Sequence, residues 1–258
     1  MIYLIYLITG LLAGIVGGLL GTGGCALMMP VIRFGFHFDP AFAVGTTLTA
    51  VVFTAASGAI QHLRMKNVDT KAAAVTGVSG VLGVILGSLV FGYIKDYGRV
   101  NDLIIGIAFI GVSIRMLYEG LTGKGPVAKP GQELPGSSAA KSALGSFIGF
   151  LTGIIGLGGG YALVPSYLYF FRAPMKLAIG TSMAAFVWMA LVGSIFKLYQ
   201  HVVNVPVAIT LGIGALVGAI IGAKLVAKIK PNVLKALFGF LFLYVSLKYI
   251  FLFFGIHI

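Results

Sequence analysis

Long apolar runs separated by short polar segments dominate the pattern of hydrophobic and polar positions along the chain. Five windows contain no Asp, Glu, Lys or Arg: 1–32, 41–61, 72–94, 142–171 and 177–196. A helix needs about 20 mostly apolar residues to cross a bilayer. The runs lack the alternation of barrel strands, and in hydrocarbon a helix pairs its own backbone groups. The pattern predicts an all-α polytopic membrane protein with 8 to 10 membrane segments.

Composition excludes a soluble globular protein. Of the 258 residues, 59% are hydrophobic and only 9% are charged, and the mean hydropathy is +1.06. Too few polar residues remain to cover a surface exposed to water. The N-terminal stretch MIYLIYLITGLLAG lacks the basic start of a cleaved signal peptide and leads into further apolar segments. We therefore expect it to form a retained first membrane helix.

The net charge of +12 does not indicate a nucleic-acid partner in a chain of this kind. The Lys and Arg residues lie mainly in short connections between apolar windows, where they set the orientation of the helices. A single cysteine, Cys25, excludes an internal disulfide and a thiolate metal cluster. Metalloprotease and nucleotide-binding motifs are missing. We expect no enzyme, no nucleic acid, no metal and no cofactor; the lipid bilayer is a partner, and a homodimer is left open.

The chain contains an internal repeat with an offset of 135 residues. Shifting residues 10–95 onto residues 145–230 makes eleven glycines coincide, where chance would give about two. The segment between the two copies is rich in Gly, Pro and charge, as linkers are. The repeat predicts two membrane domains, 1–119 and 141–258, joined by a cytoplasmic linker over 120–140.

Two glycine clusters occupy equivalent places in the two copies: GTGGC at 21–25 and GLGGG at 156–160. Most of the other repeated glycines form stripes at every fourth residue, which are typical of closely packed membrane helices. Consecutive glycines instead disfavour a helix by about 1 kcal/mol each and permit positive φ angles. The clusters therefore predict that each half has a helix broken within the membrane, either crossing fully or re-entrant.

The distribution of basic residues favours an odd number of spans in each half. With eight simple spans the basic residues divide evenly between the two sides of the membrane. If the chain reverses at each glycine cluster, 13 basic residues lie on the side of the linker and four on the other side. Cytoplasmic loops carry the excess of Lys and Arg. We therefore expect two inverted repeats, as in many secondary transporters, in the cell membrane with both termini outside.

Each predicted break creates a helix N-terminus inside the membrane, with unpaired N–H groups and about half a positive charge. Such ends bind anions, and hydroxyl residues follow each cluster. Packing is the alternative role for the cysteine, and interhelical hydrogen bonding for the hydroxyls. The candidate substrate ligands are Gly21, Thr22, Gly23, Gly24, Cys25, Thr46, Thr47, Gly156, Gly158, Gly159, Gly160, Thr181 and Ser182.

Charged residues near the predicted spans also favour an anion. His62 and Lys197 coincide under the 135-residue shift and are candidate pathway cations, with snorkelling towards lipid headgroups as the alternative. Arg115 precedes Glu119 by four residues and is expected to pair with it. All six acidic residues fall in connections or at span ends. Cation and proton carriers commonly need a carboxylate within the membrane, so the pattern suits a carrier of anions.

Two motifs, GLLGTGGCALMMP at 18–30 and GIIGLGGGYALVP at 153–165, are each followed by a Gly-Thr pair, in AVGTT at 43–47 and AIGTS at 178–182. Together they resemble the sulfite exporter TauE/SafE family over nearly the whole chain. The resemblance implies a membrane permease for sulfur-containing anions such as sulfite, sulfoacetate or other organosulfonates, typically working in export.

The sequence thus predicts a secondary transporter that exports small sulfur-containing oxyanions, bound at the ends of the broken helices near the midplane. A membrane potential that is negative inside is worth about 2.3 kcal/mol per charge per 100 mV and would suffice to drive anion efflux. Two alternatives stay open: a passive anion channel lined by the same helix ends, and a proton-coupled permease of another small organic anion.

Overall fold

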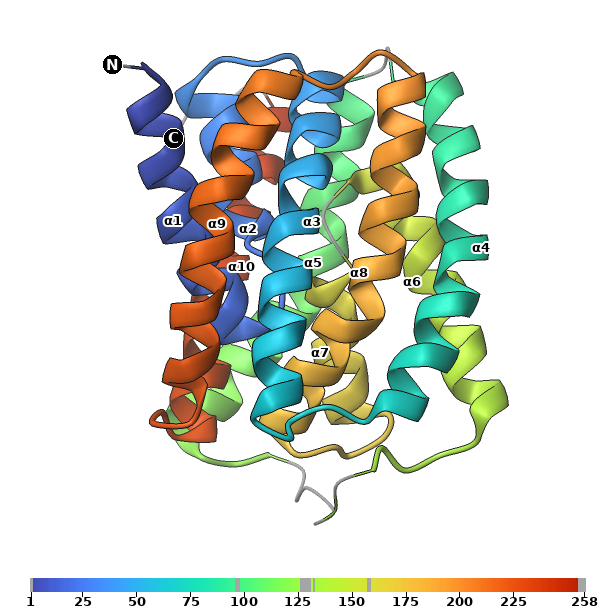
Figure 1. Cartoon of the computed structure of the whole chain (residues 1–258), viewed down its shortest axis with the longest axis vertical. Helices are drawn as coiled ribbons and strands as arrows, with labels where there is room; N and C mark the ends of the chain where they lie inside the picture. Colours follow the sequence, from blue (N-terminus) through green and yellow to red (C-terminus); the bar gives the residue numbers. More distant parts are fainter. Residues whose placement is uncertain (1, 96–97, 126–130, 132, 157–158, 255–258) are drawn as a thin grey trace.

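The protein is described by a computed structural model that covers residues 2–95, 98–125, 131, 133–156 and 159–254 (Figure 1). The first half contains the helices α1 (Ile2–Leu20), α2 (Cys25–Pro30), η1 (Val31–Gly35, a π-helix), α3 (Pro40–Arg64), α4 (Thr70–Ile94) and α5 (Gly98–Thr122). The second half contains α6 (Ser138–Ile155), α7 (Gly160–Tyr169), α8 (Met175–Tyr199), α9 (Val205–Val226) and α10 (Pro231–Phe253). The described residues form helices and connections without a strand, so the all-α prediction is confirmed.

Seven of the helices in the described part of the chain are long and apolar enough to cross a membrane: α1, α3, α4, α6, α8, α9 and α10. Many of their large apolar side chains are exposed, including those of Leu82, Trp188 and Phe240. Such a surface is suited to lipid and not to water. The chain is therefore a multi-pass membrane protein.

Helices in the two halves begin at equivalent positions. The starts of α2 and α7, α3 and α8, and α4 and α9 are each 135 residues apart. Their caps correspond too: the Asp69 side chain accepts a hydrogen bond from the Ala72 N–H at 2.9 Å, and the Asn204 side chain accepts one from the Val207 N–H at 3.3 Å. Asp and Asn are favoured N-cap residues, and here they fix the first turns of α4 and α9.

The chain runs in opposite directions through corresponding helices of the two halves. Figure 1 shows α1 descending from the top, α2 turning back upwards, and α3, α4 and α5 then running down, up and down. The second half starts at the bottom, so α6 ascends, α7 descends, and α8, α9 and α10 run up, down and up. The start of α1 and the end of α10 therefore lie at one end of the molecule, and the described residues of the linker lie at the other.

Glycine stripes bring the two halves into backbone contact. A Cβ atom added at Gly10, Gly14 or Gly18 of α1 would overlap the backbone of α9, and one at Gly145, Gly149 or Gly153 of α6 would overlap that of α4. Each half thus packs its first helix against the fourth helix of the other half, while α3 and α8 pack together between these pairs. Small residues allow this close approach, as predicted for these stripes.

The linker docks at its described end onto the connection between α3 and α4. The second carboxylate oxygen of Asp69 accepts a hydrogen bond from the Leu134 N–H at 2.6 Å, and the Lys141 ammonium donates one to the Leu134 carbonyl at 2.6 Å. Leu134 itself is buried. One aspartate therefore holds both the start of α4 and the linker.

The directions of the helices generate a labelling prediction that uses two equivalent loop positions. Lys66 and His201 are both exposed, and they belong to the loops α3–α4 and α8–α9, which lie at opposite ends of the molecule (Figure 1). In a Cys25→Ala background, we expect a cysteine at position 201 to react with a membrane-impermeant thiol reagent in intact cells and one at position 66 to be protected until the cells are opened. The eight-span arrangement would put both loops on one side, so equal labelling of the two positions would contradict the prediction.

Candidate anion site at the helix breaks

The first break is a four-residue turn between α1 and α2 that depends on glycine. Gly21, Gly23 and Gly24 have φ angles of 75°, 71° and 80°, a region that other residues rarely adopt. The N–H groups of Gly21 and Thr22 bond to the Gly17 carbonyl at 2.9 and 3.2 Å, which closes the end of α1. The chain then reverses, and α2 begins at Cys25.

The second break follows the same plan. Gly156, with φ 69°, caps α6 by donating its N–H to the Thr152 carbonyl at 2.9 Å. The Gly159 carbonyl accepts the N–H groups of Ala162 and Leu163 at 3.1 and 2.9 Å as α7 begins. The predicted ligand Gly158 lies outside the described residues. The helix therefore stops and restarts at the place where the sequence put the second glycine cluster.

The two breaks meet in the interior. A Cβ added at Gly160, the first residue of α7, would overlap the Gly21 carbonyl and the backbone of Thr22. Ser182 of α8 donates its hydroxyl to the same Gly21 carbonyl at 3.0 Å and to the Ile179 carbonyl at 2.8 Å. Four of the predicted ligands, from three segments far apart in the sequence, are thus brought together.

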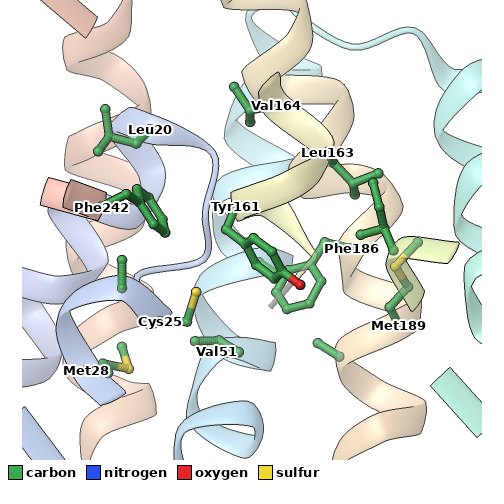
Figure 2. Packing of buried hydrophobic residues seen from close by; sticks show 14 of the residues in the cluster. Leu20, Cys25, Met28, Val51, Tyr161, Leu163, Val164, Phe186, Met189 and Phe242 are labelled. Atoms are coloured by element: carbon green, nitrogen blue, oxygen red, sulfur yellow. The ribbon is translucent and has the colours of Figure 1, made fainter. Parts of the chain in front are cut away.

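Aromatic and aliphatic side chains enclose the meeting point. A Cβ added at Gly23 would lie 3.0 Å from the Phe186 ring and 3.5 Å from Val51, and one at Gly159 would lie 3.4 Å from the Phe186 ring. Cys25, Val51, Tyr161 and Phe186 belong to one buried cluster (Figure 2). The sequence analysis did not include Val51 and Phe186 among the site residues, because both side chains are apolar. Their equivalence under the 135-residue shift could have identified them.

Two buried hydroxyls at the breaks lack a partner among the described residues. The side chains of Thr22 and Thr47 are 0% exposed, and neither Oγ1 atom makes a hydrogen bond in the described structure. Thr22 lies within the first break, and Thr47 lies one turn before Val51 on α3. Leaving a buried hydroxyl without a partner costs about 1–3 kcal/mol. Both oxygens are therefore able to donate a hydrogen bond to a ligand that enters the site.

The neighbouring predicted ligands Thr46 and Thr181 are engaged elsewhere. The Thr46 hydroxyl accepts a hydrogen bond from the Asn204 N–H at 3.0 Å, and the Thr181 hydroxyl accepts one from the Asp69 N–H at 3.0 Å. These bonds hold the loops that precede α9 and α4. The structure thus gives the two threonines equivalent roles in joining the halves and directs their hydroxyls towards the loops.

His62 and Lys197 lie under the ends of α1 and α6. The Nε2–H group of His62 donates to the Gly18 carbonyl at 3.1 Å, and the Lys197 ammonium donates to the Gly153 carbonyl at 2.8 Å. Lys197 also lies 3.2 Å from the centroid of the Phe91 ring. Both side chains are 0% exposed, so neither snorkels to the surface of the described structure. Each side chain thus donates to a carbonyl in the last turn of a helix, where carbonyls need donors from outside the helix.

The electrostatic consequence is an interior that suits an anion. The negative ends of α1 and α6 are capped by His62 and Lys197, whereas the positive end of α7 meets the turn that leads into α2. The described carboxylates lie in connections or near helix ends: Asp39, Asp69, Glu119 and Glu133. The described residues contain no group of side chains able to hold a metal ion. Helix dipoles and hydroxyls, without an opposing carboxylate at the breaks, can offset the charge of a small anion.

Apolar helices around a buried polar site with paired helix ends are the features of a membrane transport protein. The chain belongs to the sulfite exporter TauE/SafE family, whose model matches residues 6–249. The probable membrane transporter protein YunE of Bacillus subtilis is 28% identical over 236 residues, which cover 83% of this chain and 85% of that protein. Probable membrane transporter proteins of Xylella fastidiosa and Methanocaldococcus jannaschii are 29% and 27% identical, with 81% and 80% of this chain and 78% and 80% of those proteins covered. No solved structure matches the chain.

The contrast between Thr46 and Thr47 generates a stability prediction. Thr46→Val leaves the Asn204 N–H without its acceptor, so we expect the free energy of unfolding to fall by about 1–2 kcal/mol. Thr47→Val removes a hydroxyl that has no described partner and should leave stability unchanged or raise it. Thermal unfolding of the purified variants without substrate measures both effects. A larger loss of stability for Thr47→Val than for Thr46→Val would contradict the assignment of the two hydroxyls.

Proposed function

We propose that the protein is a secondary transporter that exports small sulfur-containing oxyanions, such as sulfite or sulfoacetate, across the cell membrane. The main observation behind this proposal is that the N-terminus of α7 meets the first break at Gly21 and Thr22, where the Thr22 hydroxyl has no described partner. A second hydroxyl without a described partner, that of Thr47, lies one turn before Val51, which packs against the same break. An oxyanion offers several acceptor oxygens, and backbone N–H groups and hydroxyls are the donors that such a ligand needs. The family to which the chain belongs carries sulfite export in its name.

The two halves act in this proposal as inverted repeats that alternate around one central site. Equivalent glycines of the two halves make equivalent contacts with the opposite half. The interface between α1 and α9 therefore resembles the interface between α6 and α4. Alternating access needs two conformations of similar free energy, and two matched interfaces provide them. Rocking of one half against the other would open the breaks first to the linker side and then to the other side.

Burial of the site supports a carrier over a passive channel. Thr22, Cys25 and Thr47 are all 0% exposed, so the described structure is closed towards both faces at this point. A pore that conducts by diffusion needs a continuous path, whereas a carrier passes through an occluded state. The substrate is released only when one side opens.

A proton-coupled permease is the second candidate, and it rests on His62. This histidine is buried, and its Nδ1 atom has no hydrogen-bond partner among the described residues. Histidine changes charge within the physiological pH range and serves as a proton shuttle in other proteins. Protonation of His62 during transport would couple anion movement to a pH gradient.

Flux through proteoliposomes tests the proposed function. Because the breaks offer dipoles and hydroxyls, which offset charge without carrying a proton, we expect sulfite efflux to be electrogenic. A valinomycin–potassium potential that is negative on the loaded side should accelerate efflux, and a pH gradient alone should do little. Thr47→Val should raise the KM for sulfite by about tenfold, since it removes a hydrogen bond to a charged ligand.

His62→Gln is the control for hidden proton coupling, because the glutamine amide can still donate to the Gly18 carbonyl but cannot titrate. Potential-driven export would be wrong, and the proton-coupled permease right, if wild-type flux responded to the pH gradient and not to the potential. In that case the His62→Gln variant should no longer respond to the pH gradient. An absence of saturable sulfite flux in the wild-type protein would refute both.

A further inference from the structure

A groove between α5 and α7 lies outside the meeting point of the breaks. It has a volume of about 430 Å³ and is lined by residues that include Gly111, Arg115, Tyr161, Ser166 and Tyr169. Tyr161 is the second residue of α7 and belongs to the buried cluster around the breaks. Arg115 and Tyr169 lie near the ends of their helices on the linker side. The groove therefore connects the linker end of the molecule to the neighbourhood of the anion site.

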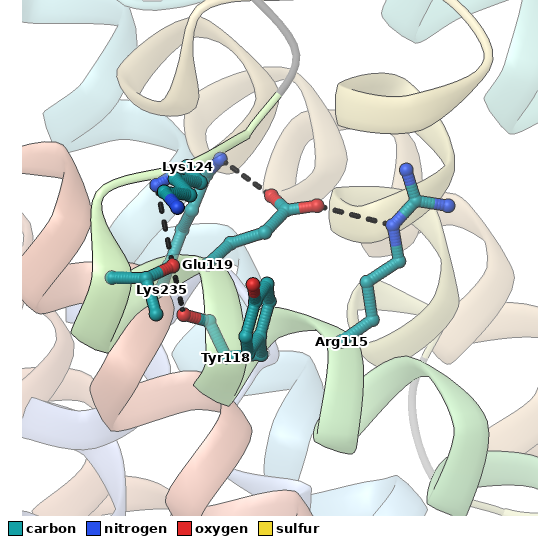
Figure 3. Close-up of polar contacts among 6 residues, drawn as sticks. Arg115, Tyr118, Glu119, Lys124 and Lys235 are labelled. Atoms are coloured by element: carbon teal, nitrogen blue, oxygen red, sulfur yellow. Dashed lines mark hydrogen bonds and ion pairs between the residues drawn. The ribbon is translucent and has the colours of Figure 1, made fainter.

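Among the described residues that line the groove, Arg115 is the one that carries a charge. Its Nε–H group donates to one oxygen of Glu119 at 3.1 Å, as the sequence spacing predicted, and its guanidinium carbon lies 4.0 Å from the centroid of the Tyr169 ring. Figure 3 shows the two terminal guanidinium nitrogens pointing away from the Glu119 carboxylate. The side chain is fixed by these contacts, yet it stays 57% exposed.

The local charge is positive although Arg115 has an acidic partner. The other oxygen of Glu119 accepts a hydrogen bond from the Lys235 ammonium of α10 at 2.8 Å (Figure 3). One carboxylate thus serves two cations, which leaves one unit of positive charge beside the groove. A guanidinium whose Nε is occupied keeps four N–H donors at its terminal nitrogens, in the planar geometry that suits an oxyanion.

We propose that this groove is the cytoplasmic vestibule of the transporter, in which Arg115 captures the oxyanion before it passes Tyr161 to the helix breaks. The inference rests on the proposed function and on the proposed orientation, with the linker in the cytoplasm. A positive charge at the mouth of an apolar-walled groove raises the local concentration of anions. The phosphate of a lipid headgroup has the same oxyanion chemistry as the substrate, so the test must separate these two sources.

Sulfite transport measured from each side of the membrane with the full-length protein tests the vestibule. In inside-out vesicles, which present the cytoplasmic face, Arg115→Gln should raise the KM by about tenfold with kcat unchanged. In right-side-out vesicles its KM should equal that of the wild type. Lys124→Gln is the matched control, because Lys124 is an exposed cation at the same end that does not line the groove. Equal KM values for Arg115→Gln and wild type in inside-out vesicles would overturn the vestibule alone.

A second variant tests the path without touching the charge. A Cβ added at Gly111 meets no atom within 4 Å, so Gly111→Leu should fold and fill the groove. We expect it to abolish transport from the cytoplasmic face, while Gly111→Ala keeps most of it. Normal transport by a folded Gly111→Leu variant would overturn the proposal. This variant carries the test if Arg115→Gln does not fold.

Lipid composition separates the two sources of oxyanion. The KM effect of Arg115→Gln should persist in proteoliposomes of pure phosphatidylcholine, which contain no anionic lipid. An effect that appears only with phosphatidylglycerol would assign Arg115 to a lipid headgroup and overturn the vestibule. Failure of the wild-type protein to transport sulfite in either direction would instead refute the proposed function, and the vestibule with it.

Discussion

A helix that stops in the interior of a protein must satisfy backbone groups that water would satisfy at a surface, and this constraint governs the structure. Both breaks in this chain are built from glycines, and four of them have φ angles between 69° and 80°. A residue with a side chain would strain the backbone at these four positions. At a further glycine, Gly160, a Cβ would collide with the backbone of the first break. The same residues that end the helices thus allow the two breaks to touch.

The helix ends at the two breaks are satisfied in two different ways. Carbonyls at the ends of α1 and α6 receive donors from His62 and Lys197, which are buried one beneath each helix. The N-terminus of α7 instead contacts the first break, where the Thr22 hydroxyl has no described partner, and the Thr47 hydroxyl on α3 has none either. Positive helix ends beside such hydroxyls suit the anion of the proposed function, and the described residues place no carboxylate at the breaks.

Periodicity and the 135-residue repeat predicted much of the fold. The glycine clusters lie between α1 and α2 and between α6 and α7, and the starts of α3 and α8, and of α4 and α9, differ by the offset of the repeat. These features are local, since backbone conformation and apolar length decide them. The stripe of Gly10, Gly14 and Gly18 was likewise recognised as a packing surface, because residues four apart share one face of a helix.

The partners of individual side chains depend on tertiary contacts, which the sequence alone did not predict. Thr46 and Thr47 are adjacent in one motif, yet the first bonds to the Asn204 N–H and the second has no described partner, because neighbouring helix positions point about 100° apart. The sequence predicted the pairing of Arg115 with Glu119, but Lys235 joins them from another helix 116 residues away. The groove beside Arg115 likewise arises only when α5 and α7 are placed side by side.

Anomalous scattering from a bound anion would show whether the helix breaks hold the substrate. Selenite has the shape and charge of sulfite, and its selenium atom is identified by anomalous diffraction from crystals of the protein grown with it. We expect one anomalous peak between the two breaks, within hydrogen-bond reach of the Thr22 and Thr47 hydroxyls through the selenite oxygens. A peak elsewhere, with the breaks unoccupied at a selenite concentration that saturates transport, would contradict the claim that the paired helix ends bind the substrate.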